Sequence, residues 1–137
     1  MDLLRAIMIA AKGLKAQSGR MRVISENIAN ADSTGTKPGA DPYRRHVPTF
    51  QSEYDKELQA QVIRMGHVTT DTKANFVVRY EPGHPAADAK GNVKYPNVNL
   101  MVESMDMREA QRSYEAGLKI IEGARQLYGM TLKVLSG

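Results

Sequence analysis

The sequence contains no cysteine and no tryptophan, and only two of its 137 residues are phenylalanine. The lack of cysteine excludes disulfides, thiolate metal sites and cysteine nucleophiles. Any core must be aliphatic, and eight methionines supply adaptable packing surface. No apolar run approaches the roughly 20 residues that a membrane-spanning helix needs. We therefore expect no membrane insertion.

Signatures of catalysis and of ligand binding are also missing. The chain has no GxxxxGK[ST], GxGxxG or GxSxG sequence, and no HExxH. Its three histidines, His46, His67 and His84, are scattered, and none has a partner at a metal-ligand spacing. We therefore predict that the protein is not an enzyme and takes no cofactor and no metal.

The charge balance is mildly basic, with a net charge of +4. This value fits nucleic acid, an anionic surface or an acidic protein partner and does not choose among them. The best candidate for an anion contact is Arg44-Arg45-His46, with Tyr43 beside it. We favour a salt bridge from this cluster to acidic residues of a neighbouring subunit, and expect no nucleic acid.

Two apolar stripes dominate the rest of the chain, one near each end. Leu3, Ile7, Leu14, Met21, Ile24 and Ile28 belong to one, and Met107, Ala110, Tyr114, Ile121, Ala124, Tyr128 and Leu135 to the other. With Ala10, Gln17, Ala31, Gly117 and Thr131 at the remaining positions of the two series, the spacings alternate between three and four. This periodicity predicts helices over Leu3–Ala29 and over 99–134. At about 1.5 Å per residue these helices would be roughly 40 and 50 Å long.

Between the helices the pattern changes to short apolar and β-branched segments with turns. Segments 46–51, 61–70, 75–80 and 93–95 are candidate strands, and a short helical turn is an alternative for 54–60. The sequences around Gly83 and Gly91 are turn signals, and Asn97 or Asn99 is a candidate N-cap for the second helix.

The predicted fold class is therefore mainly α with a small β-rich insertion. We expect residues 1–35 and 99–137 to form one discontinuous helical module, and 36–98 an inserted, irregular domain. The insertion is too poor in large apolar residues to cover both helices, so they pair as a coiled-coil-like module within a helical assembly.

Five glycines stand inside the predicted helices, at positions 13, 19, 117, 123 and 129. Each costs about 0.8–1 kcal/mol relative to alanine, or roughly 4–5 kcal/mol together. We expect weak helices in a free monomer, ordered by assembly, with the glycines permitting close backbone approach.

Several stretches resemble, in order, the bacterial flagellar basal-body rod proteins. Ser25-Glu-Asn-Ile-Ala-Asn-Ala-Asp-Ser-Thr-Gly35 is similar to the N-terminal signature that rod and hook proteins share. Asp41-Pro-Tyr-Arg-Arg45, Tyr80-Glu-Pro-Gly-His-Pro-Ala-Ala-Asp88, Tyr95-Pro-Asn-Val-Asn99 and Asp106-Met-Arg-Glu-Ala-Gln-Arg-Ser-Tyr-Glu-Ala116 resemble proximal-rod members of that family. Gly117 stands where such proteins often carry asparagine, and residues 51–75 match no quoted motif.

The resemblance implies a structural subunit of the proximal rod, exported unfolded by the flagellar type III apparatus without a cleaved signal peptide. It implies a helical rod across the periplasm, a drive shaft that encloses the export channel. The implied partners are other copies, other rod proteins, and the ring and export-gate base. The residues that we expect at subunit interfaces are the stripe residues named above together with Asn27, Asn30, Arg44 and Arg45.

Three other functions stay open at this point. A coiled-coil adaptor in the cytoplasm would share the two stripes but would form a small, discrete oligomer. A nucleic-acid-binding protein would use Arg20, Arg22 and the Arg44-Arg45 pair, with steep salt dependence. The third alternative is an enzyme, and the absence of a recognisable group of catalytic residues weighs against it.

Replacing Ile24 with aspartate tests the predicted interface. Ile24→Asp should abolish assembly while expression persists, because a charge buried in the stripe costs several kcal/mol. A motility assay checks this result, and normal swimming of the variant would contradict the assignment.

Overall fold

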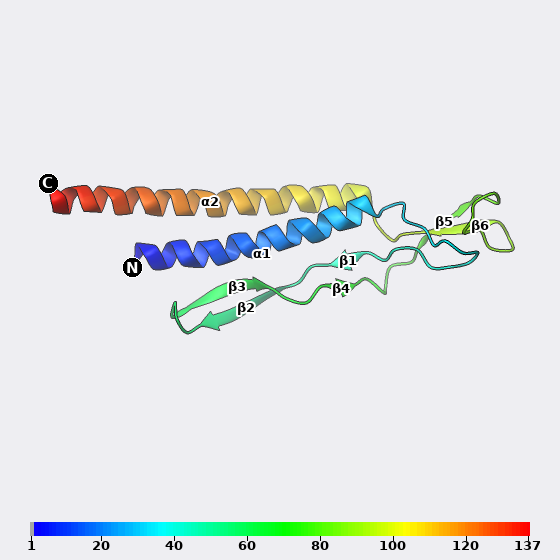
Figure 1. The fold of residues 1–137 in the computed structure, drawn as a ribbon, viewed down its shortest axis with the longest axis horizontal. Coiled ribbons are helices and arrows are strands. Elements are labelled where there is room, and N and C mark those ends of the chain that lie inside the picture. The colour runs from blue at the N-terminus through cyan, green and yellow to red at the C-terminus, as the bar shows by residue number, and fades with distance from the viewer. Residues whose placement is uncertain (1) are drawn as a thin grey trace. The chain divides into compact units, whose positions relative to one another are not determined.

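A computed structural model describes residues 2–137 of the chain. The elements in chain order are α1 (Leu3–Ala29), β1 (His46–Val47), β2 (Phe50–Asp55), β3 (Ala60–Met65), β4 (Thr69–Thr70), β5 (Val77–Tyr80), β6 (Asn92–Tyr95) and α2 (Leu100–Ser136), as Figure 1 shows. The prediction of a mainly α chain with a small β-rich insertion is confirmed. Among these residues, neither helix combines the length and the apolar character that crossing a bilayer requires.

Both helices form where their apolar periodicity predicts them. The first has the predicted bounds, and the second extends two residues beyond Val134. Asn99 caps α2, since its Oδ1 accepts hydrogen bonds from the backbone N–H groups of Met101 and Val102 at 3.0 and 3.3 Å. The side chain of the other N-cap candidate, Asn97, instead bonds the backbone of Arg45 and Asp71.

The strands pair as three separate antiparallel ribbons: β1 with β4, β2 with β3, and β5 with β6. The reading of residues 54–60 as a helical turn was wrong, because β2 continues to Asp55 and β3 begins at Ala60. Asp55 causes the reversal. Its Oδ1 accepts the N–H groups of Glu57 and Leu58, both at 3.0 Å, and closes a tight hairpin turn.

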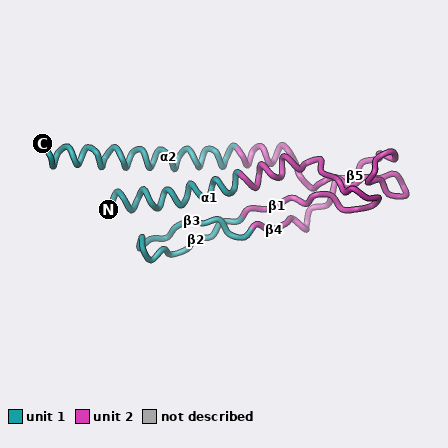
Figure 2. Tube along the Cα trace, viewed as in Figure 1, with its two compact units in different colours: residues 1–21, 49–67, 108–137 teal, residues 22–48, 68–107 magenta. Residues whose placement is uncertain are grey.

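The chain divides into two compact units, which Figure 2 colours separately. Unit 1 contains residues 1–21, 49–67 and 108–137, and unit 2 contains residues 22–48 and 68–107. Each unit therefore takes one part of each long helix together with part of the β-rich middle.

In unit 1, α1 lies between α2 and the β2–β3 hairpin (Figures 1 and 2). The two helices are antiparallel, because Leu14 lies against Gly117 whereas Arg20 pairs with Glu109 at 3.4 Å. On the other side, Lys12 of α1 forms an ion pair with Asp55 of the hairpin at 2.9 Å. The buried side chains of this unit are Ala16, Leu58, Val62, Ala110 and Ala124.

Unit 2 has a small core around the β5–β6 ribbon. Ala86, Val93 and Tyr95 form its buried cluster, and the Tyr95 hydroxyl donates to Glu81 at 2.8 Å. The turn before β6 uses Asp88, whose Oδ1 accepts the backbone N–H groups of Lys90 and Asn92. Gly91 in this turn has a φ of +83°, a conformation that side chains other than glycine rarely adopt.

The helix glycines fall into two groups. A Cβ on Gly117 would lie 2.6 Å from Leu14 Cδ2, and one on Gly19 would meet the sulfur of Met65. At these two positions a side chain of another element lies close to the helix backbone, and close backbone approach between copies stays a prediction. Gly13, Gly123 and Gly129 have no atom of the described chain within 4 Å of a Cβ position.

This difference predicts opposite behaviour for two alanine variants. Gly13→Ala should raise the free energy of unfolding by about 0.8–1 kcal/mol, because alanine is the better helix former and meets no neighbour. Gly117→Ala should gain less or lose stability, since Leu14 must move. Urea unfolding followed by circular dichroism measures both, and equal gains would contradict the packing described here.

Candidate functional site

A buried carboxylate in unit 2 joins both helices to the chain between them. Glu103 of α2 is fully buried. Its Oε1 forms an ion pair with Nε of Arg45, and Nη2 of the same arginine lies 3.8 Å from Asp106 Oδ2. A buried charge needs such partners, because taking an unpaired carboxylate out of water is strongly unfavourable. Arg45 thus ties the segment before β1 to the first turns of α2.

Asn27 of α1 completes this buried group. Its Oδ1 accepts the Tyr43 hydroxyl at 2.7 Å and the backbone N–H of His46 at 2.9 Å. Its Nδ2 donates to the His46 carbonyl at 2.8 Å and, more distantly, to Glu103 Oε2 at 3.5 Å. All four hydrogen-bonding positions of the amide are occupied, so the fully buried side chain is satisfied. We call Asn27, Tyr43, Arg45, His46 and Glu103 the polar junction.

Tyr43 stays neutral in this junction. Burial raises the pKa of its hydroxyl, and the carboxylates of Glu26 and Glu103 raise it further. The ring lies 5.0 Å from the His46 ring, centroid to centroid. The neutral hydroxyl donates a hydrogen bond to Asn27 Oδ1, so this bond and the raised pKa both favour the protonated form of Tyr43.

A second set of contacts holds the loop before β5 to the junction. The side chain of Asn97 accepts the Arg45 backbone N–H at 2.8 Å and donates to the Asp71 carbonyl at 3.0 Å. Arg44 donates to the same carbonyl at 3.3 Å, and its guanidinium stacks 4.2 Å above the Phe76 ring. The Asp71 carboxylate accepts hydrogen bonds from the backbone N–H groups of Ala74 and Lys73, and these bonds lower its pKa.

Both predicted arginines therefore have partners within the chain. Arg45 finds in Glu103 and Asp106 the carboxylates that we expected from a neighbour. A contact of Arg44 or Arg45 with another subunit stays a prediction.

The turn that follows α1 is held by Asn30. Its Nδ2 donates to the Glu26 carbonyl at 2.9 Å, and its Oδ1 accepts the Ser33 hydroxyl at 3.0 Å. The Ser33 carbonyl then accepts the Tyr43 N–H at 3.0 Å. The small polar residues of this segment thus fix the direction in which the chain leaves α1.

The predicted helix stripes are mostly covered by the chain itself. Ile24, Ala110 and Ala124 are buried, at 2%, 0% and 7% exposed. Eight others are partly buried: Leu3, Ile7, Leu14, Met21, Ile28, Met107, Tyr114 and Ile121. Tyr128 and Leu135, near the end of α2, are exposed. Because Ile24 is buried within one copy, Ile24→Asp also destabilises the single chain, so an exposed position gives a cleaner test of assembly.

Sequence reasoning missed a second stripe on α2, which is exposed. It consists of Ala116, Ile120, Gly123, Leu127, Met130 and Val134, and we call it the outer stripe. Ile120, Gly123, Leu127 and Val134 each precede a residue of the predicted stripe by one position, which rotates them by about 100° around the helix axis. Its spacings also alternate between four and three, so the sequence contained the periodicity of this second stripe as well.

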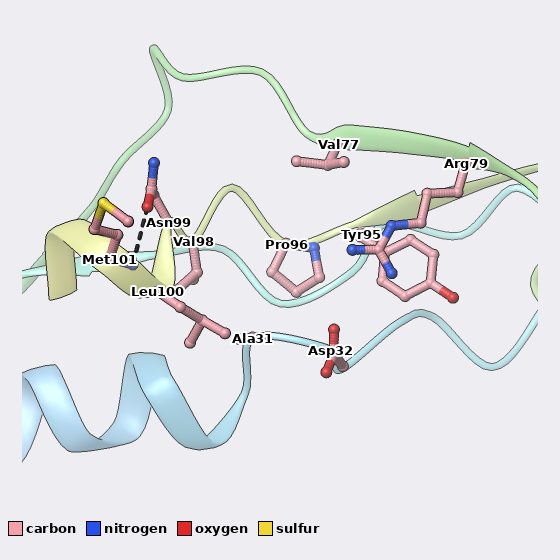
Figure 3. A pocket seen from close by; sticks show the side chains of 10 residues that line it. All are labelled: Ala31, Asp32, Val77, Arg79, Tyr95, Pro96, Val98, Asn99, Leu100 and Met101. Atoms are coloured by element: carbon pink, nitrogen blue, oxygen red, sulfur yellow. Dashed lines mark hydrogen bonds between the residues drawn. The ribbon is translucent and has the colours of Figure 1, made fainter. Parts of the chain in front are cut away.

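An open hollow of about 380 Å³ lies in unit 2, between the end of α1, the β5–β6 ribbon and the start of α2. Figure 3 shows the side chains that line it. Asp32 and Arg79 give its lining one carboxylate and one cation, and Val77, Leu100 and Met101 make it largely apolar. Within residues 2–137, no group of three or more His, Asp or Glu side chains is placed to hold a metal ion.

Comparison with known proteins gives one consistent result. Residues 7–37 match the family model of the flagella basal body rod protein, and residues 89–134 match that of the flagellar basal body rod FlgEFG protein C-terminal. The chain is 50% identical to flagellar basal-body rod protein FlgC of Agrobacterium fabrum over 95% of its own length and 93% of the relative's. It is 36% identical to FlgC of Borreliella burgdorferi over the whole of both chains, and 33% identical to FlgC of Aquifex aeolicus over 97% of each.

The polar junction predicts a large loss of stability when its carboxylate is neutralised. Glu103→Gln leaves the mostly buried Arg45 without its main counter-ion. It should lower the free energy of unfolding by about 3 kcal/mol, the low end for a broken buried pair, because Asp106 remains nearby.

Glu109→Gln is the matched control. This carboxylate also pairs with an arginine but is 70% exposed, so its removal should cost less than about 1 kcal/mol. Urea unfolding compares the two variants, and equal losses would show that the buried pair does not hold the junction together.

Proposed function

The chain belongs to the FlgC family of flagellar basal-body rod proteins, and from this premise we propose how its helices build the rod. The protein is a structural subunit of the basal-body rod. We place it in the proximal part of the rod, with copies of itself, other rod proteins and the ring and export-gate base as partners. Its task there is mechanical, to transmit torque and to enclose the export channel, and it performs no catalysis.

The observation that carries this proposal is the apolar surface that one copy leaves uncovered. Ile120, Leu127, Met130 and Val134 of α2 are 57%, 54%, 57% and 80% exposed. Exposed apolar residues that continue over several helix turns are typical of a surface that another protein covers. A rod built from many copies covers such surfaces by repetition, and many contacts in parallel make a stiff shaft.

The polar junction supports the same role from within the subunit. Because Glu103, Arg45 and Asn27 join α1, the segment before β1 and α2, the part of unit 2 around them is held together by buried, charge-assisted bonds. We propose that residues 1–35 and 99–137 act as the core module of the rod and that residues 36–98 face outward. A coiled-coil adaptor is the weaker alternative, since it does not explain the family membership.

A single charge on the outer stripe tests the proposal. Leu127→Glu, produced in a flagellated bacterium whose own copy of the gene is deleted, should abolish swimming and remove the protein from purified basal bodies. The reason is that a carboxylate in a covered apolar surface costs several kcal/mol per copy.

The neighbouring variant Gln126→Glu is the control, because it adds the same charge at an exposed polar position. It should swim normally, and circular dichroism should show the same helix content for both variants. If Leu127→Glu cells swim like wild type, this face of α2 is not covered in the rod and the proposal fails.

A further inference from the structure

The last two turns of α2 project beyond the helix that packs against it in unit 1. Leu14 of α1 lies against Gly117 of α2, and the two helices are antiparallel. Because both helices rise by about 1.5 Å per residue, Leu3 at the start of α1 lies level with about residue 128 of α2. Figure 1 shows α2 continuing past this point. Residues 129–136, about 12 Å of helix, therefore lie beyond the reach of α1, and we call them the overhang.

The overhang has a wide and exposed apolar surface. Met130, Leu132, Val134 and Leu135 are 57%, 49%, 80% and 79% exposed. Successive residues of a helix are rotated by about 100°, so these four side chains spread over about 200° of the circumference. A helix that packs on one surface needs an apolar stripe of only about 100°. The overhang is therefore fully covered only by a concave site, which encloses it on more than one side.

The hollow of unit 2 is a concave site with apolar walls. Val77 of β5 and Leu100 and Met101 of α2 belong to its lining and are 47%, 50% and 73% exposed (Figure 3). Its volume of about 380 Å³ lies within the range of about 300–1,000 Å³ that is usual for pockets enclosing a ligand. The hollow thus offers the apolar enclosure that the overhang needs.

The charges of the two surfaces are complementary. Lys133 is the only charged residue of the overhang. The hollow is lined by one cation, Arg79, and one carboxylate, Asp32. Arg79 is held inside unit 2, where its guanidinium stacks 4.3 Å from the centre of the Tyr95 ring. Asp32 takes part in none of the ion pairs formed within residues 2–137, so its carboxylate is available to the lysine.

A single copy cannot fill its own hollow. Leu100 and Met101 begin α2 and the overhang ends it, so about 28 helical residues, or about 42 Å, separate the two. The overhang that enters a hollow must therefore come from another protein, and a second copy of this chain carries one.

We propose that the overhang of one copy inserts into the unit 2 hollow of the next copy. The inference rests on the proposed function, since it names two surfaces through which copies of the subunit meet. Such a contact is heterologous, because two different surfaces of the same chain meet, and its repetition builds an open helical array.

The absence of cysteine makes a direct test possible. Val77→Cys and Val134→Cys are produced from separate alleles in one strain that lacks the native gene, and swimming cells are oxidised with a copper catalyst. A disulfide-linked dimer should form when both alleles are present, and neither allele alone should give it.

Val78→Cys is the matched control for the hollow. Val78 follows Val77 in β5 and is 58% exposed, but its side chain points to the opposite face of the strand. Combined with Val134→Cys, it should give no dimer. An equal yield of dimer from Val77→Cys and Val78→Cys would show that the link reports random encounter and would overturn the inference.

The other outcomes also overturn the inference. Swimming cells without a Val77–Val134 dimer would exclude the contact. A Val134–Val134 dimer would assign the overhang to a symmetric contact, and a cross-link to another protein would assign it to another rod component. In all these cases the cells swim with this protein as their only copy, so the proposed function stands. Swimming of the strain that carries no copy of the gene would instead contradict the proposed function.

A charge in the hollow decides the matter if a cysteine variant prevents swimming. Val77→Glu should abolish swimming, because its carboxylate meets the apolar overhang, whereas Val78→Glu should swim normally. Circular dichroism of both purified variants should show the same helix content.

A second substitution then identifies the occupant of the hollow. Val134→Lys, added to Val77→Glu, should restore part of the motility, because the lysine of one copy meets the glutamate of the next. Gln111→Lys, which adds the same charge at another exposed position of α2, should restore none. Normal swimming of Val77→Glu, or no recovery with Val134→Lys, would overturn the docking of the overhang in the hollow.

Discussion

The central constraint on this protein is the apolar surface of its helices, which exceeds what one chain can cover. The second helix alone is 37 residues long, and the strands between the helices form only two-stranded ribbons. One stripe of each helix is used inside the chain, where Ile24, Ala110 and Ala124 are buried. The stripe one residue earlier on α2 remains exposed. Hydrophobic burial therefore favours a state in which another protein surface covers this stripe.

The polar junction explains how unit 2, which has only a small apolar core, keeps a defined geometry. Apolar contacts are not directional, whereas the hydrogen bonds of Asn27 and the ion pair between Glu103 and Arg45 each require one arrangement. The junction lies in unit 2, where it joins both helices to the segment before β1. Order inside the subunit thus comes from a few buried polar groups, and surface for assembly comes from exposed apolar ones.

Periodicity predicted the two helices closely, including the bounds of α1 and the cap at Asn99, because stripes and caps are local signals. It did not separate a stripe that packs inside the chain from one that faces outward, since both obey the same spacing. The partners of Arg45 and Asn27 were also beyond prediction. Glu103 is 58 residues from Arg45 in sequence, and nothing local marks that pair. The hairpin at Asp55 was misread because its turn depends on one side-chain oxygen accepting two backbone N–H groups.

The most direct test of the account is a concentration series of the purified chain, followed by circular dichroism and analytical ultracentrifugation. Helices with five glycines and an uncovered stripe should be weak alone and should gain order by association. The account predicts a poorly helical monomer at low concentration, with helix content rising as large or filamentous species form. A stable, highly helical dimer or tetramer at every concentration would contradict it and would favour the adaptor.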